Sequence, residues 1–281
     1  MKPEVAIVAA GNMGAGVARR LHEHGVKVVT LLAGRSDATV KRAQQAGMIG
    51  VAAEALADVD LLLSIVPPAN ALAFAEQTAF ALKCARRKPV FVDCNAVNPA
   101  TVRHIQAVIA ATGSDFIDAG IIGFPPVPGT KKGPRIYASG EHAAKLQVLR
   151  DYGLDIRILD GPIGAASALK MAYAGISKGH IAIFAAMVLA AARSGSAEAL
   201  RQELAESDSA LLASMAERLP RSFTKAWRWG PEMREIAEFA REDPSANEIW
   251  TNIAALYERL AHDLAGEKRE IEALQRFFGP E

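Results

Sequence analysis

Cysteine is scarce in this sequence, and its scarcity excludes two kinds of stabilisation. The 281 residues include only Cys84 and Cys94, which are too few for a disulfide framework and lack partners at the spacing of a metal site. The six histidines are scattered along the chain. We therefore expect no metal ion, and the low cysteine content favours a reduced, cytoplasmic protein.

Excess charge and a membrane-length hydrophobic run are also missing. The formal net charge is +1, which argues against a nucleic-acid-binding surface. The longest apolar run, Ile181 to Ala192, is shorter than the roughly 20 residues that cross a bilayer, and it predicts a buried helix. Near the N-terminus, Glu4 and the glycines that follow interrupt what would otherwise resemble a signal peptide. We expect no membrane partner.

The first twenty residues contain a strand, a glycine turn and the start of a helix. Val5 to Val8 is an apolar run with the length of a buried strand, followed by Gly11, Asn12, Met13 and Gly14 and then by apolar residues at helical spacing. This arrangement is typical of the phosphate-binding corner of dinucleotide-binding folds. Ala9 stands where the usual fingerprint has a glycine. The alternative is a packed turn with no ligand.

The end of the next predicted strand, Val26 to Leu32, suggests which dinucleotide is bound. An acidic residue at this position takes the ribose 2′-hydroxyl of NAD, whereas an arginine accommodates the 2′-phosphate of NADP. Here the strand is followed by Gly34, Arg35 and Ser36, with no acidic residue. We therefore expect NADP, with NAD less favoured. In the alternative interpretation, Arg35 is a solvated surface residue and Ser36 caps the following helix.

Strand and helix patterns alternate through the first 160 residues, which predicts a parallel, doubly wound sheet of the Rossmann type in residues 1–160. From Pro162 to Phe278 only helical patterns remain, with breaks near Gly195, Pro220, Gly230 and Pro244, so residues 161–281 are expected to form an all-α domain. The further strands expected are Met48–Val51, Leu61–Val66, Val90–Asp93, Phe116–Ala119, Arg135–Ser139 and Ile156–Leu159, and the helices between them Asp37–Ala46, Asn70–Cys84, one that Asn98 caps, and Glu141–Tyr152.

The stretch from Gly120 to Gly129 is rich in glycine and proline. It is expected to lack regular structure and to lie at the end of a sheet strand, where ligands bind in folds of this class.

The opening of the helical domain contains one lysine, Lys170, in a segment of small and apolar residues. With Ser167, Tyr173 and Ser177 it forms a polar stripe at three- and four-residue spacing. A lysine is costly to bury unless it is paired or used, and burial lowers the pKa of an amine towards the range that a general acid/base needs. The alternative is that Lys170 extends to solvent.

These motifs together resemble those of the β-hydroxyacid dehydrogenase / 6-phosphogluconate dehydrogenase-like superfamily, and the likeness extends over the whole chain. The resemblance implies a Rossmann domain, a helical second domain joined to it by a long helix, an active site between the domains, and a homodimer formed through the helical half. It also implies that Lys170 takes the hydroxyl proton while hydride moves to the nicotinamide. Val66, Pro67 and Asn95 are expected at the nicotinamide end of the cofactor groove.

At some positions where the family holds its substrate, this chain has a different residue. The serine of the family's substrate-anchoring Ser-Gly-Gly is Ile122, followed by Gly123 and Phe124, and the asparagine expected four residues after the lysine is Ala174. A late Lys-Asp pair aligns loosely with Pro231 and Glu232. The residues expected to contact substrate are therefore Ile122, Gly123, Phe124, Tyr173, Ala174 and Ser177.

Three functions remain open on the sequence. The first is an NADP-dependent oxidoreductase for a β-hydroxyacid or related alcohol/carbonyl pair, with Lys170 as general acid/base. The second is an imine reductase on the same fold, and the third is a dinucleotide-binding protein without catalysis. The retained lysine favours the first, whereas the missing asparagine and serine favour the third.

Overall fold

The computed structural model describes residues 2–279, which divide between Lys170 and Met171 into two compact units. The domain boundary expected at residue 160 lies shortly before this division. Residues 1, 280 and 281, which end the two expected domains, lie outside the described residues.

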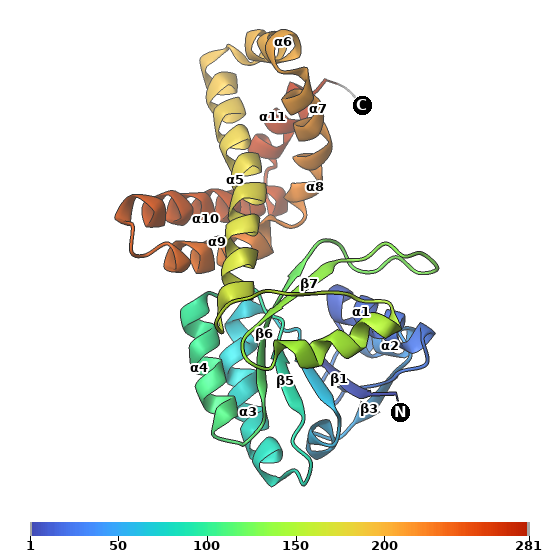
Figure 1. Cartoon of the computed structure of the whole chain (residues 1–281). Helices are drawn as coiled ribbons and strands as arrows, with labels where there is room; N and C mark the ends of the chain where they lie inside the picture. Colours follow the sequence, from blue (N-terminus) through green and yellow to red (C-terminus); the bar gives the residue numbers. More distant parts are fainter. Residues whose placement is uncertain (1, 280–281) are drawn as a thin grey trace. The chain divides into compact units, whose positions relative to one another are not determined.

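The first unit is built on an eight-stranded sheet (Figure 1). The strand order is β3-β2-β1-β4-β5-β6-β7-β8, and every neighbouring pair is parallel except β6 and β7. The order reverses between β1 and β4, which is where doubly wound sheets bind ligands. The strands are β1 (Glu4–Val8), β2 (Lys27–Leu31), β3 (Met48–Val51), β4 (Leu61–Ser64), β5 (Val90–Asp93), β6 (Phe116–Ile122), β7 (Arg135–Ser139) and β8 (Asp155–Ile158).

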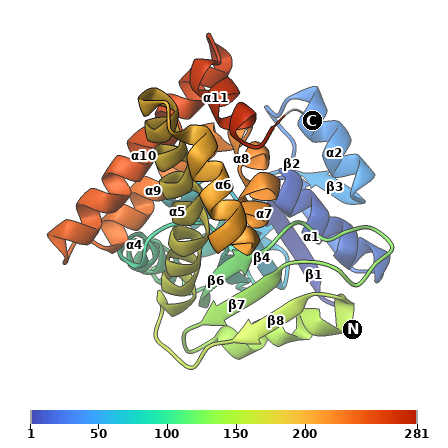
Figure 2. The ribbon, with the colours of Figure 1, turned by 90° about the horizontal axis from the view of Figure 1, so that it is seen from above.

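Helices cover both faces of this sheet (Figures 1 and 2). One buried core includes Leu21, Ala43 and Leu149 and thus joins α1 (Asn12–Glu23), α2 (Asp37–Gln45) and the 3-10 helix η3 (Ala143–Tyr152) to one face. The other core includes Ala75 and Ile105 and joins α3 (Ala71–Cys84) and α4 (Pro99–Ala110) to the opposite face, with η1 (Glu54–Ala57) and η2 (Pro68–Asn70) as short connections. Strands buried on both faces explain the continuous apolar runs in the sequence.

Two expectations for this unit need correction. The glycine-rich stretch was expected to be irregular from Gly120, but β6 continues through Ile122 and pairs antiparallel with β7. Gly120 is needed there because a Cβ atom would lie 2.7 Å from the carbonyl oxygen of Ala166. The segment expected to form a helix from Glu141 to Tyr152 is a 3-10 helix that begins at Ala143.

The second unit contains helices and, among its described residues, no strand. The expected breaks near Gly195, Pro220 and Pro244 are confirmed, but the break at Gly230 is wrong because α9 runs through it. Gly230 allows α10 to approach closely, since a Cβ atom there would lie 2.9 Å from Cγ of Glu258. The helices are α5 (Ala165–Ser194), which starts in the first unit, α6 (Ala197–Ser207), α7 (Ser209–Arg218), α8 (Pro220–Phe223), α9 (Ala226–Phe239), α10 (Pro244–Ala265) and α11 (Arg269–Phe277).

Helix α5 is the long helix that the family resemblance implies. Gly175 and Gly179 lie against the Trp250 ring of α10, and Phe184 packs on Phe277. The expectation that Ile181 to Ala192 is buried fails on one side, because Ile183 is 56% exposed. By length and composition α5 could cross a membrane, with a mean hydropathy of 1.6 in its most apolar 18 residues, yet half of that window is buried inside the structure.

Candidate active site

The turn between β1 and α1 has the shape that a pyrophosphate requires. Gly11 is exposed, and no atom lies within 4 Å of the position that a Cβ would take there. Gly14 is buried, and a Cβ on it would lie 2.0 Å from the carbonyl oxygen of Ala9, so only glycine lets the helix pack this closely on the strand. The turn is thus open on its outer side and closely packed on its inner side.

The first turn of α1 offers hydrogen-bond donors. No side chain caps it, and its first turn contains no acidic residue, so the backbone N–H groups of Asn12 and Met13 stand at a positive helix end. Arg42 of α2 donates to the carbonyl oxygen of Ala10 at 3.1 Å and ties α2 to the same turn. The residues present therefore fit the phosphates of a dinucleotide.

Arg35 and Ser36 lie exposed between β2 and α2. Ser36 occupies the N-cap position of α2, but its hydroxyl makes no capping hydrogen bond and instead lies 3.1 Å from the hydroxyl of Thr39. The two hydroxyl groups and the Arg35 guanidinium are donors of the kind that bind a phosphate.

Asn95 holds the end of β4 in place. Its Oδ1 accepts from the backbone N–H of Val66 at 2.7 Å, and its Nδ2 donates to Ser64 Oγ and to Asp93. Because Asn95 is buried and its amide is used inside the protein, it shapes the strand end at Val66 and Pro67 through the backbone.

Asp118 is a residue of the site region whose role the sequence analysis missed. It is fully buried in β6, as the third of the seven residues of that strand, and meets the first turn of α5. Its Oδ2 accepts from Ser139 Oγ and from the backbone N–H groups of Gly164, Ala166 and Ser167 at 2.9 to 3.1 Å, and its Oδ1 accepts from Ser167 Oγ at 2.6 Å. A single aspartate inside a run of apolar strand residues was the available signal.

Lys170 lies one turn further along α5 than Ser167. Its Nζ donates to the carbonyl oxygen of Ile121 at 2.6 Å, and the residue is half-buried. The amine is therefore held at the end of β6 rather than extended into solvent. In this position, at the edge where the strands of the sheet end, it can exchange a proton with a bound ligand.

The residues expected to contact substrate lie on two elements. Ile122 ends β6 and is buried, whereas Phe124 just after it is 77% exposed. Tyr173 and Ser177 follow Lys170 on α5 at a spacing of three and seven residues, and Ala174 is buried. Helical periodicity puts Lys170, Tyr173 and Ser177 close to one face of α5, as expected from the sequence.

The loop from Gly123 to Pro134 is fastened to α1 by Arg20. This buried guanidinium donates to the carbonyl oxygens of Val127, Thr130 and Lys132 at 2.7 to 3.2 Å, and to that of Gly153 at 3.1 Å. The helix that begins at the glycine turn therefore also positions the loop that follows β6.

The second unit contains a buried ion pair. Lys178 of α5 pairs with Glu232 of α9, and its ammonium lies 5.3 Å from the centre of the Trp229 ring. Burial lowers the pKa of Lys178, and the Glu232 carboxylate opposes this shift. Glu232 belongs to the segment that aligned loosely with the family's late Lys-Asp pair, and its partner is on α5.

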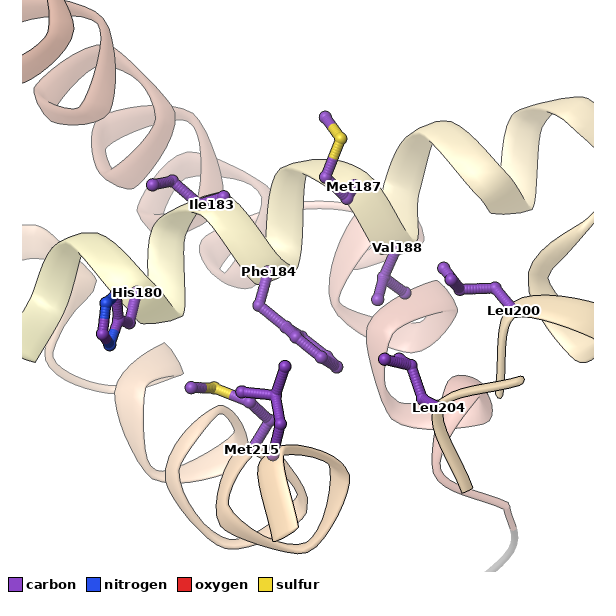
Figure 3. Close-up of a pocket in the computed structure, with 9 residues that line it drawn as sticks. His180, Ile183, Phe184, Met187, Val188, Leu200, Leu204 and Met215 are labelled. Atoms are coloured by element: carbon purple, nitrogen blue, oxygen red, sulfur yellow. The ribbon is translucent and has the colours of Figure 1, made fainter. Parts of the chain in front are cut away.

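The second unit also has an apolar groove between α5, α6 and α7 (Figure 3), with a cavity volume of about 420 Å³. Phe184 and Val188 of α5 point towards Met215 of α7 and Leu204 of α6 (Figure 3). His180, Ile183, Met187, Leu200 and Leu211 complete the lining. Across residues 2–279, no group of three His, Cys, Asp or Glu side chains could hold a metal ion.

Both units contain segments that match models of known protein families. Residues 4–151 match the model of the NAD binding domain of 6-phosphogluconate dehydrogenase, and residues 191–260 match a domain of unknown function, DUF1932. The solved structure of the conserved protein MTH1747, described as similar to 3-hydroxyacid dehydrogenases, is 30% identical over 93% of this chain and 98% of its own, with a TM-score of 0.71.

Two more distant structures share the fold. A 3-hydroxyisobutyrate dehydrogenase of Mycobacterium tuberculosis, solved with L-serine, is 16% identical over 98% of this chain and 100% of its own, with a TM-score of 0.72. An imine reductase of Myxococcus stipitatus, solved with NADP+, is 18% identical over 98% of this chain and 99% of its own, with a TM-score of 0.59.

Proposed function

Because the chain belongs to the family of the 6-phosphogluconate dehydrogenase NAD-binding domain, we propose that it is an NADP-dependent oxidoreductase acting on a β-hydroxyacid-like alcohol/carbonyl pair. Its family and fold are those of NAD(P)-dependent, 3-hydroxyacid dehydrogenase-like oxidoreductases. The finer assignments, which are NADP, the substrate and the role of Lys170, rest on the residues described above.

The position of Lys170 carries this proposal. Its amine is fixed 2.6 Å from the carbonyl oxygen of Ile121, at the edge of the sheet to which the glycine turn also belongs. When bound, the nicotinamide accepts or supplies the hydride. In the oxidation direction the neutral amine of Lys170 takes the hydroxyl proton as hydride leaves the same carbon, and in reduction the ammonium returns it, so charge and protons balance.

Turnover tests the role of Lys170. Lys170→Met is expected to lower kcat by about 10²- to 10⁴-fold, the usual contribution of a general acid/base, while NADPH binding is unchanged. The assay follows NADPH over a panel of β-hydroxyacids, their oxo forms and cyclic imines, with Lys83→Met on the exposed side of α3 as the matched control. A kcat within about tenfold of the parent would refute the acid/base role.

The cofactor preference rests on Arg35 and Ser36. Arg35→Ala is expected to weaken NADPH binding by about ten- to a hundredfold and to leave NADH binding unchanged, because only NADPH places a phosphate at this position. Equal losses for both dinucleotides, or none, would contradict the assignment. Arg103→Ala, an exposed arginine of α4, is the control.

Imine reduction is a second candidate. It is favoured by the loss of the polar residues expected at Ile122 and Ala174, because an imine substrate needs no carboxylate anchor there. NADPH consumption with cyclic imines alone would select this function. NADPH binding without consumption across the whole panel would instead support a non-catalytic dinucleotide-binding protein.

We also propose that the protein is a homodimer joined through α5. Ile176, Ile183 and Met187 are 63%, 56% and 57% exposed, and their spacing of seven and four residues is that of a helix–helix seam. Ile183 and Met187 also line the groove of Figure 3, so a second copy would cover one continuous apolar surface. The closed, two-fold interface that such a self-complementary surface gives is the commonest form of oligomer.

Sedimentation measures the oligomeric state directly. Ile183→Glu is expected to produce monomers, because it buries a charge in the seam. Ile249→Glu, which alters an isoleucine of α10 that is 54% exposed, should leave the dimer intact. A parent protein that sediments as a monomer at micromolar concentration would refute the proposal.

A further inference from the structure

A row of buried polar side chains crosses the sheet of the first unit. The strand registers pair Ser64 with Asp93, Asp93 with Asp118, and Asp118 with Ser139. None of the four is more than 1% exposed. Register partners on adjacent strands lie about 5 Å apart and point to the same face. Two aspartates are therefore neighbours in the buried interior of the sheet.

The two carboxyl groups have unequal surroundings. Asp118 accepts five hydrogen bonds, three of them from the backbone at the first turn of α5. Asp93 accepts only from Asn95, through its side-chain amide and its backbone N–H, and the Oδ2 of Asp93 has no partner in the described part of the chain. A negative charge is consequently much better stabilised on Asp118 than on Asp93.

The groups around Asp93 do not supply a compensating charge. Asn95 and Ser64 face it and are neutral, and the Cys94 thiol beside it has its pKa raised by burial and by the two aspartates. From β6 it faces Asp118, whose side chain connects to Ser139 of β7 and to the positive first turn of α5. Burial, and then the charge of Asp118, raise the pKa of Asp93 to about 7.

We propose that Asp93 and Asp118 form a carboxyl pair that carries a single negative charge in mildly acidic solution and loses its remaining proton, from Asp93, around neutral pH, and that the ionised Asp118 holds the first turn of α5. That turn leads directly to Lys170, and both aspartates are thus positioning residues for the amine. The link to catalysis rests on the function proposed for Lys170, whereas the charge state of the pair does not.

Loss of the Asp93 proton changes the balance of this cluster. A second negative charge then appears beside Asp118, which strengthens the field at the first turn of α5 and favours the protonated form of an amine nearby. The Asn95 amide, which donates to Asp93 and accepts from Val66, connects the same event to the end of β4. The protonation state of one buried aspartate is thus felt at both strand ends that border the candidate site.

Carbon-13 NMR of the aspartate carboxyl groups tests the charge state. We expect one buried aspartate signal to titrate with a midpoint near pH 7 and to disappear in Asp93→Asn, which imitates the protonated side chain. Asp155→Asn, an exposed aspartate of β8, should leave that titration unchanged. A midpoint below about pH 5 for Asp93, within the ordinary range of aspartates, would overturn the proposal.

The electrostatic coupling between Asp93 and Lys170 can be measured without turnover. The nitrogen-15 signal of the Lys170 ammonium should show a small inflection near pH 7 in the parent and none in Asp93→Asn. An inflection that persists in Asp93→Asn would overturn the coupling even if Lys170 proves catalytic. Asp93→Asn should fold and bind NADPH like the parent, whereas Asp118→Asn should lose stability because the donors around Asp118 lose their anion. An equal loss of stability in the two variants would also refute the unequal roles of the two aspartates.

Discussion

From the buried Lys178–Glu232 ion pair we predict how much stability the helical unit loses when one of the two charges is removed. Its side chains are only 17% and 12% exposed, and the Lys178 ammonium also lies over the Trp229 ring. Removal of one member of a buried pair usually costs about 3 to 5 kcal/mol, because the remaining charge is left uncompensated. Residual exposure and the ring contact reduce this figure, so we expect Glu232→Gln to lower the free energy of unfolding by about 2 to 4 kcal/mol.

The tryptophans provide a specific assay. All three, Trp227, Trp229 and Trp250, lie in the helical unit, so their fluorescence during urea unfolding reports on that unit. The double variant Lys178→Met/Glu232→Leu should be about as stable as the parent, since it removes both charges together. Glu258→Gln breaks an ion pair with Arg234 that is about half exposed and should cost less than about 1 kcal/mol.

The pH dependence supplies a second check on this pair. Burial already lowers the pKa of Lys178, and loss of the Glu232 charge lowers it further. A lysine whose folded-state pKa is lowered makes the folded state less stable while the amine is protonated, and this penalty fades as the pH rises. The deficit of Glu232→Gln should therefore shrink in alkaline buffer. A cost below about 0.5 kcal/mol for Glu232→Gln, or a double variant as unstable as Glu232→Gln, would refute the reasoning.

Three further predictions concern the first unit. Gly11→Ala should leave the free energy of unfolding unchanged, because the added Cβ meets no protein atom. It should abolish tight NADPH binding in calorimetry, because the same Cβ stands where the phosphates approach. Gly14→Ala should also lower the free energy of unfolding. Arg20→Met should release the loop from Gly123 to Pro134 and speed tryptic cleavage at the exposed lysines within it by about tenfold or more, with the neighbouring Arg19→Met as control. The raised pKa of Asp93 means that its contribution to stability is greatest below about pH 4 and is lost as the pH rises to about 7, by up to about 4 kcal/mol; urea unfolding of Asp93→Asn should lack this slope.

The sequence predicted most helices and strands of the first unit, because the bounds of each element depend on residues close to it in the chain. The strand, turn and helix around Gly14 follow from packing that no other residue permits. Asn98 caps α4 through hydrogen bonds to the N–H groups of Ala100 and Thr101, as its position before Pro99 indicated. In both cases a few neighbouring residues determine the backbone.

The predictions that were wrong concern residues whose structure depends on contacts with segments distant in sequence. Gly120 continues β6 because β7 pairs with it and α5 lies against it, and no pattern near residue 120 contains that information. Gly230 remains helical because α10 packs against it. Likewise, the exposed apolar face of α5 cannot be distinguished from a buried one by composition, since only the arrangement of α6, α7 and α10 decides which side is covered.

The candidate site was predicted in part for the same reason. Residue type and spacing were enough to select Lys170 and the glycine turn as candidate residues. The donors to Asp118 come from residues 139 to 167, and the role of Asn95 depends on its contact with Val66, so both required the folded chain.

The hydrogen bonds of Asp118 affect the folding of the chain during synthesis and the choice of a fragment for expression. Three of its donors come from the backbone between Gly164 and Ser167, some 46 to 49 residues after Asp118 itself. During synthesis, the aspartate therefore stays without these donors until the ribosome has released the chain beyond Ser167. A recombinant dinucleotide-binding fragment that stops at residue 160 would keep a buried carboxylate and lose its three backbone donors, so an expressible fragment needs at least the first turn of α5.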